Sequence, residues 1–182
     1  MINLVNGNIF DAPNTFSFAQ CISKDSHRGM FRGIAVEFLK RFPALQVLRG
    51  KVLVEGSAEP VFVDGKILFN LVSKPTFWSK PKVGCLRDCI ISMHAHASVF
   101  GIRDIAVPLL GSGHDKLDFE TDVYPILEEV FGGSKVHLHI YRQGRHGIDR
   151  FDLVYLSFLV IYNKRYIHYA VFTLSQHNLN VH

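Results

Sequence analysis

The sequence is poor in the features that mark several large classes of protein. Its 182 residues include three cysteines, and none of them forms a CxxC pair. This excludes a disulfide-dense scaffold and a cysteine-rich zinc fold, so we interpret Cys21, Cys85 and Cys89 as free thiols in a reducing compartment. No apolar run has the length of a membrane span, and the first residues lack the basic and apolar parts of a signal peptide. We therefore expect an intracellular protein without a membrane partner.

The two commonest nucleotide-binding signatures, the P-loop and GxGxxG, are also missing. The formal net charge of +4 suits an anionic ligand and is compatible with nucleic acid, but it does not indicate nucleic-acid binding. A chain of 182 residues with 48% hydrophobic and 20% charged residues is typical of one globular domain with a proper core.

The stretch with the clearest functional pattern reads IAVPLLGSGHDK and spans residues 105–116. It opens as an apolar run of the length of a buried strand and breaks into Gly111-Ser112-Gly113, where glycines permit left-handed backbone and close approach of an anion. Asp115 follows, and a helix is expected to begin near Phe119. A strand that runs into a glycine turn and then a helix is where α/β folds bind phosphates.

Hydrophobic periodicity predicts the other elements. We expect strands at residues 2–5, 16–22, 51–55, 61–63, 66–73, 105–110 and 136–141, and helices at 33–42, 83–100 and 119–131. Asp64-Gly65 predicts a hairpin, and Pro125 predicts a kink or a later start in the last helix. The alternation of strands and helices predicts an α/β fold with a mixed sheet between helices in three layers. Residues 143–182 show no clear periodicity, and we expect an appendage of unknown structure that packs poorly or not at all.

Four polar loops follow the predicted strands, at residues 6–8, 23–33, 74–82 and 111–115. If the strands share a sheet, the ligand crevice lies outside their carboxyl ends, and glycine amides, a lysine and a carboxylate suit a nucleotide diphosphate. Lys74 is either a solvated strand end or an amine that attacks a carbonyl or acetal carbon. Asp115 either closes a turn or acts as an acid/base with Lys74.

The ten histidines do not predict a metal site. His94 and His96 alternate in a helix and point apart, whereas His137 and His139 share a strand face without an acidic or cysteine partner nearby in sequence. We therefore expect neither a metal nor a cofactor. Cys21 could touch a ligand without being a nucleophile.

Taken together, the segments resemble a macro domain, the ADP-ribose-binding fold, and within it the terminal ADP-ribose protein glycohydrolases, which remove ADP-ribose from glutamate. The resemblance covers residues 2–141 and rests on the order and spacing of these pieces: NGNIFDAPNT, AQCIS, GIAVEFLKRF, LVSKP, Lys80-Pro81, GIRDIAVPLLGSGHDKL and ILEEVF. It implies a macro domain at residues 1–142 followed by a C-terminal extension at 143–182.

The resemblance also implies the chemistry. Lys74 in LVSK falls on the family's nucleophile and Asp115 on its acid/base, which implies a covalent lysyl intermediate at the anomeric carbon of the distal ribose. The implied partners are ADP-ribose and ADP-ribosylated proteins, and we expect a monomer in the nucleus or cytoplasm. The implied ligand-binding residues are Asn8, Ile9, Cys21, Ile22, Ser23, Gly33, Ile34, Ala35, Pro108, Leu109, Leu110, Gly111, Ser112, Gly113 and His114.

This chain departs from the family pattern at three places. Asn8 stands where the family usually has an aspartate that binds the adenine amino group, so we expect weakened adenine selectivity at most. Phe31-Arg32 replaces small residues and could clamp a phosphate or crowd the ribose. The chain also runs on beyond Gln143, where the short family members end.

The predicted activity is hydrolysis of mono-ADP-ribose from glutamate and aspartate side chains, with deacetylation of O-acetyl-ADP-ribose as an additional activity. Three alternatives remain open: an ADP-ribose reader without turnover, a phosphatase for ADP-ribose 1″-phosphate, and a nucleic-acid-binding protein. A steep loss of affinity with salt would mark the last of these.

Overall fold

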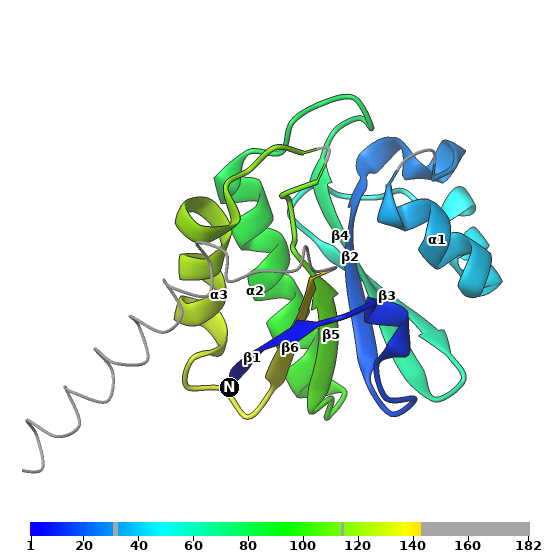
Figure 1. Ribbon diagram of the computed structural model, residues 1–182. Helices are drawn as coiled ribbons and strands as arrows, with labels where there is room; N and C mark the ends of the chain where they lie inside the picture. The colour runs from blue at the N-terminus through cyan, green and yellow to red at the C-terminus, as the bar shows by residue number, and fades with distance from the viewer. Residues whose placement is uncertain (31–32, 114, 143–182) are drawn as a thin grey trace, which may run out of the picture. The chain divides into compact units, whose positions relative to one another are not determined.

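The computed structural model describes residues 1–30, 33–113 and 115–142, and its centre is a mixed β-sheet (Figure 1). The described strands are β1 (Ile2–Asn6), β2 (Ser17–Ser23), β3 (Ala58–Val63), β4 (Lys66–Lys74), β5 (Asp104–Pro108) and β6 (His137–Arg142). They lie in the order β1-β6-β5-β2-β4-β3. All neighbours pair in parallel except β3, which pairs antiparallel with β4 at the edge.

Helices cover both faces of the sheet, which confirms the predicted three-layer α/β/α arrangement. Helix α1 (Ile34–Arg41) lies on one face, and α2 (Val83–Val99) and α3 (Tyr124–Phe131) lie on the other (Figure 1). Short 3₁₀ segments, η1 (Ile9–Asp11), η2 (Lys24–Arg28) and η3 (Pro43–Gly50), connect the elements on the α1 side.

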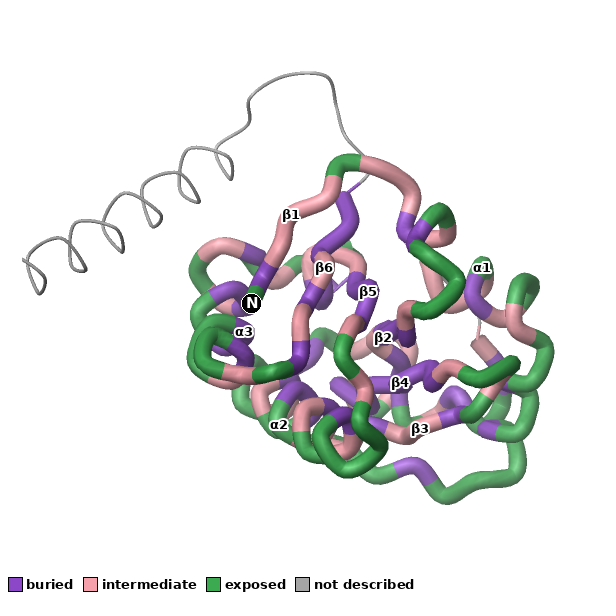
Figure 2. The backbone as a smooth tube through the Cα atoms, turned by 90° about the horizontal axis from the view of Figure 1, so that it is seen from below, coloured by how far each residue is buried: buried purple, intermediate pink, exposed green. Residues whose placement is uncertain are grey.

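The core fills the space between these layers, and the middle strands are its most buried part (Figure 2). On the α2 face, the residues at the predicted helical spacing are all buried: Leu86, Cys89, Ile90, Met93 and Ala97. On the α1 face, the ring of Phe38 packs against Phe10, Phe18 and Phe42. Burying a phenylalanine side chain of this kind stabilises the fold by about 2–3 kcal/mol.

The predicted strand at residues 51–55 is wrong. These residues form no ladder, because β3 already occupies the sheet edge beside β4. Val52 and Val54 are exposed and only Leu53 is buried in the core. The apolar run therefore resembles a strand in sequence but contributes one buried side chain from a loop. The hairpin at Asp64-Gly65 is confirmed, and both residues have positive φ, 47° and 77°.

The expectation for Pro125 is confirmed. Residues Phe119–Val123 form a π-helical turn, and α3 begins after it with the proline in its first turn, where no N–H is needed. Among the described residues, no helix is both long enough and apolar enough to cross a bilayer. The residues singled out at 31–32, His114 and the extension at 143–182 lie outside the described residues.

Candidate functional site

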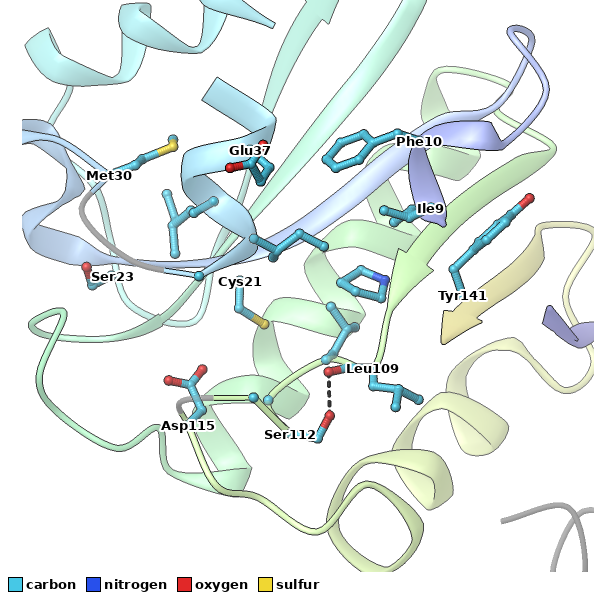
Figure 3. A pocket seen from close by; sticks show the side chains of 18 of the residues that line it. Ile9, Phe10, Cys21, Ser23, Met30, Glu37, Leu109, Ser112, Asp115 and Tyr141 are labelled. Carbon is cyan, nitrogen blue, oxygen red and sulfur yellow. Dashed lines mark hydrogen bonds between the residues drawn. The ribbon is translucent and has the colours of Figure 1, made fainter. Parts of the chain in front are cut away.

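The carboxyl ends of the five parallel strands meet at one edge of the sheet and border a cavity of about 800 Å³ (Figure 3). After β2 the chain passes to the α1 face, whereas after β5 it passes to the α3 face. The two loops therefore separate and leave a crevice between them, which is where open α/β sheets bind ligands.

The structure brings the residues implied by the resemblance into this one cavity. All of those that it describes line it: Asn8, Ile9, Cys21, Ile22, Ser23, Gly33, Ile34, Ala35, Lys74, Pro108, Leu109, Leu110, Gly111, Ser112, Gly113 and Asp115. They come from separate loops that only the sheet brings together.

Lys74 and Asp115 form an ion pair at one end of the cavity. Lys74 is the last residue of β4 and pairs in register with Ser23, and its Nζ donates a hydrogen bond to Asp115 Oδ1. The two side chains are only 11% and 12% exposed, so the pair is largely shielded from water. Direct contact between an amine and a carboxylate permits proton transfer without an intervening water.

The loop that carries Asp115 is held by backbone hydrogen bonds around Gly111. Leu117 N donates to the Gly111 carbonyl at 3.0 Å, and Lys116 N donates to the Gly113 carbonyl at 3.3 Å. Gly111 has φ of 71°, and a Cβ there would lie 2.9 Å from Leu117 Cδ1. The position therefore requires glycine for both conformation and space.

The expectation that the glycine loop offers its amides to an anion needs one refinement. The Ser112 backbone N–H and hydroxyl both donate to the Leu109 carbonyl, at 3.3 and 2.7 Å (Figure 3). That amide is therefore occupied within the loop, and it closes the turn rather than facing a ligand.

Cys21 lies beside the ion pair, but its thiol is not a nucleophile. Burial, together with the Asp115 carboxylate, raises the pKa of the thiol from 9.0 to about 12, although Ser73, Gly111 and Lys74 act in the opposite direction. Because the thiolate is the reactive form of cysteine, the raised pKa disfavours attack by this thiol at neutral pH. The structure thus leaves Lys74 as the stronger candidate nucleophile.

The side of the cavity between β2 and α1 is formed by the serines that cap η2 and by the N-terminus of α1. The Ser23 and Ser26 hydroxyls lie 3.2 Å apart, and Ser23 N donates to Ser26 Oγ. Gly33 caps α1 with φ of 63°, and Gly33, Ile34 and Ala35 line the cavity. The N-terminus of a helix presents N–H groups and a partial positive charge, which favour an anion.

The end of the cavity away from the ion pair is aromatic and apolar. Ile9, Phe10 and Tyr141 lie together there, well apart from Asp115 (Figure 3). Asn8 caps η1, and its Oδ1 accepts the Phe10 N–H at 3.1 Å. The guanidinium of Arg41 lies 4.5 Å from the centre of the Phe10 ring and holds it from one side.

Several lining residues were not singled out from the sequence: Gly7, Phe10, Ser26, Gly29, Met30, Glu37, Arg41, Phe77, Tyr141 and Arg142. Tyr141 and Arg142 could have been found, because they end a strand parallel to the others and so belong to the same sheet edge. Glu37 and Arg41 could not, because charged residues on the polar face of a helix are normally solvated.

Two of the histidines have an acidic partner that lies far from them in the sequence. Asp104, distant in sequence, places Oδ1 2.9 Å from His139 Nε2 and 3.4 Å from His137 Nδ1, so these histidines do have an acidic partner. Over the part of the chain that the structure describes, no three histidine, cysteine or acidic side chains are arranged to hold a metal ion.

Comparisons with known proteins identify the family and the fold. No family model matches the chain. The chain is 34% identical over 140 residues to the ADP-ribose glycohydrolase OARD1 of Bos taurus, covering 77% of this chain and 90% of that protein. The OARD1 of Homo sapiens is 33% identical over the same length.

The solved structures that match include macrodomains. The macrodomain of Mycobacterium tuberculosis DarG superposes with a TM-score of 0.69 at 25% identity, covering 79% of this chain and 99% of that one. Thermosipho africanus DarTG, solved in complex with ADP-ribose, superposes with a TM-score of 0.67 at 17% identity, covering 84% of this chain and 44% of that one.

Proposed function

This chain belongs to the macrodomain family, to the terminal ADP-ribose glycohydrolase type of hydrolases that act on ADP-ribose, and from that premise we propose its substrate and mechanism. It removes mono-ADP-ribose from glutamate and aspartate side chains, with Lys74 as the nucleophile and Asp115 as the acid/base. The single observation that carries the proposal is the Lys74–Asp115 ion pair, largely shielded from water at one end of the cavity.

The first half of the reaction follows from that contact. Proton transfer from the Lys74 ammonium to the Asp115 carboxylate leaves a neutral amine and a carboxylic acid side by side. The amine attacks C1″ of the distal ribose, and a C1″–Nζ bond forms as the C1″–O bond to the modified carboxylate breaks. Asp115 gives its proton to the departing carboxylate, which leaves as a carboxylic acid and ionises in water.

The second half restores the enzyme. The regenerated Asp115 carboxylate takes a proton from a water that attacks C1″, while the C1″–Nζ bond breaks and Lys74 leaves as a neutral amine. The proton then passes from Asp115 back to Lys74 and re-forms the ion pair. The net reaction consumes one water and yields ADP-ribose, a free carboxylate and a proton.

The rest of the cavity supports the same substrate. With C1″ at the ion pair, the diphosphate extends toward the N-terminus of α1, where backbone N–H groups suit its charge. The nucleobase then reaches the apolar end around Ile9, Phe10 and Tyr141. Water exclusion around a buried pair also strengthens its electrostatic effect on the reacting atoms.

The test is release of ADP-ribose from a glutamate-modified protein, compared between the wild type and Lys74→Ala. We expect release by the wild type alone, with a loss of turnover of at least about 10³-fold in the variant because the attacking atom is gone. ADP-ribose binding by the variant is measured in parallel by calorimetry, and we expect it to be nearly intact.

Each other outcome identifies a different mechanism. Release by both proteins would dismiss Lys74 as nucleophile and favour a water activated by Asp115. Binding without release by either protein would identify an ADP-ribose reader. Activity toward ADP-ribose 1″-phosphate that survives Lys74→Ala would favour the phosphatase. Deacetylation of O-acetyl-ADP-ribose stays a prediction, measured with the same two proteins.

A further inference from the structure

The apolar end of the cavity presents an unusual hydrogen-bonding group at Asn8. Its Oδ1 accepts the backbone N–H of Phe10 at 3.1 Å. A backbone N–H can only donate, so this contact fixes which way round the side-chain amide lies. The oxygen is held against the chain, and the Nδ2 group lies on the other side of the amide.

The Nδ2 donor is available to a ligand. Asn8 lines the cavity, and no group of the described residues accepts a hydrogen bond from its Nδ2. Because Nδ2 is not among the buried polar atoms that lack a partner, it is open to the cavity or to solvent. This end of the cavity thus offers the Asn8 Nδ2 group as a donor. It also offers an acceptor, because Oδ1 has a second lone pair beside the one that accepts the Phe10 N–H.

The proposed function decides which part of the ligand lies here. The reacting carbon of ADP-ribose has to reach Lys74, so the nucleobase, at the other end of the molecule, lies beside Ile9, Phe10 and Tyr141 (Figure 3). The inference therefore rests on the proposed function. Asn8 stands next to Ile9 at this end and is placed to read the polar edge of the base.

We propose that Asn8 makes the base end permissive, so that the protein binds diphosphoriboses of 6-oxopurines, such as hypoxanthine, nearly as well as ADP-ribose. The 6-amino group of adenine is a donor, whereas the 6-oxygen of hypoxanthine is an acceptor. An amide side chain offers one partner for each, but a carboxylate would accept from adenine and repel the oxygen.

The test compares dissociation constants for ADP-ribose and inosine 5′-diphosphoribose, measured by calorimetry on the wild type and on Asn8→Asp. Aspartate also accepts the Phe10 N–H, so the cap on η1 is kept and the variant should fold. In the wild type we expect the two constants to agree within about threefold. In Asn8→Asp we expect ADP-ribose to be preferred by about tenfold or more, the effect of one mismatched polar contact.

Asn3→Asp is the matched control, because it adds the same charge on β1, five residues earlier in the chain and outside the cavity, and should leave the wild-type ratio unchanged. A wild type that rejects the inosine compound by more than about tenfold would overturn the inference, as would an Asn8→Asp variant with the wild-type ratio. The readout is binding, so a protein that binds but does not hydrolyse contradicts only the proposed function. Binding of neither compound would overturn both.

Discussion

Cys21 lies beside the Lys74–Asp115 ion pair and has no part in the proposed reaction. Its thiol lies next to Asp115 and Lys74, yet burial raises its pKa from 9.0 to about 12. A thiol of this kind contributes shape and polarity to the cavity wall and no charge at neutral pH.

The raised pKa predicts a loss of stability in alkali. In the unfolded chain the Cys21 thiol ionises near its ordinary value of 9.0, whereas in the folded protein it stays protonated up to about pH 12. The free energy of unfolding should therefore fall as pH rises above 9.0, by up to about 1.4 kcal/mol per pH unit from this group.

Cys21→Ser removes the ionising group, so its alkaline fall in stability should be shallower than that of the wild type. Urea unfolding on either side of pH 9.0 measures it. Burial also raises the pKa values of Cys85 and Tyr141, which are present in both proteins and cancel in the comparison. The pKa of Cys89 is raised by burial and also by Cys21, so the comparison reports the removal of Cys21 together with its effect on Cys89. Equal slopes would mean that the Cys21 thiol ionises normally in the folded state.

Gly111 carries a second residue-scale prediction. Gly111→Ala forces a side chain into left-handed backbone at φ of 71° and against Leu117, so we expect a destabilisation of about 1–3 kcal/mol. Thermal unfolding measures it. Gly113→Ala is the matched control, since a Cβ there meets nothing within 4 Å. Equal melting temperatures for the two variants would refute the conformational role assigned to Gly111.

At the scale of the elements, a buried amide ties three strands together. Asn70 on β4 accepts from Gln20 Nε2 on β2 at 2.8 Å and donates to the Glu59 carbonyl on β3 at 3.1 Å. Both amide side chains are almost completely buried. The three strands on the β3 side of the sheet are thus joined by side-chain bonds as well as by the backbone ladder.

Asn70→Ala should cost about 2–4 kcal/mol of unfolding free energy, because it leaves the Gln20 amide and the Glu59 carbonyl without their partner. Urea unfolding of Asn70→Ala, Gln20→Ala and the double variant measures the coupling. We expect the double variant to cost less than the sum of the single ones. Strict additivity would show that the interaction between Gln20 and Asn70 contributes no free energy of unfolding of its own.

The same scale shows how far the sequence predicts the elements. Helices α1 and α2 were predicted correctly, because a face that packs on a sheet repeats with the helical period. The strand at residues 51–55 was wrong, because Val52 and Val54 are apolar but exposed. The start of β3 was missed, since Ala58-Glu59-Pro60 lacks the residues typical of strands, and only the edge position accommodates the proline.

The site was predictable where a residue ends a strand. Lys74 and Asp115 follow apolar runs, and both the loop inventory and the family resemblance point to them. Phe77 was missed because it lies in a polar loop, where a single aromatic residue forms no repeating hydrophobic pattern that would indicate burial. Arg41 contacts Phe10, which is far from it in the sequence, and the residues around either position do not predict such a contact.

At the scale of the whole molecule, the order of the strands could not be predicted. Parallel pairs join segments far apart along the chain, and local pattern does not determine which strands become neighbours. The cavity depends on that order, because it opens between the loops that leave β2 and β5 in opposite directions. Family resemblance named the residues that line the cavity, but it gave no strand order, and the periodicity of single segments contains neither.

The pairing of β1 has a consequence for synthesis. Its partner is β6, and Ile2 lies opposite Leu138, so among the described strands the first to be synthesised pairs with the last. Growing at about 5–20 residues per second, the nascent chain carries this apolar strand unpaired for several seconds or more. The sheet is completed only after β6 has left the ribosome, and until then β1 is a target for chaperones or for the strands of other chains.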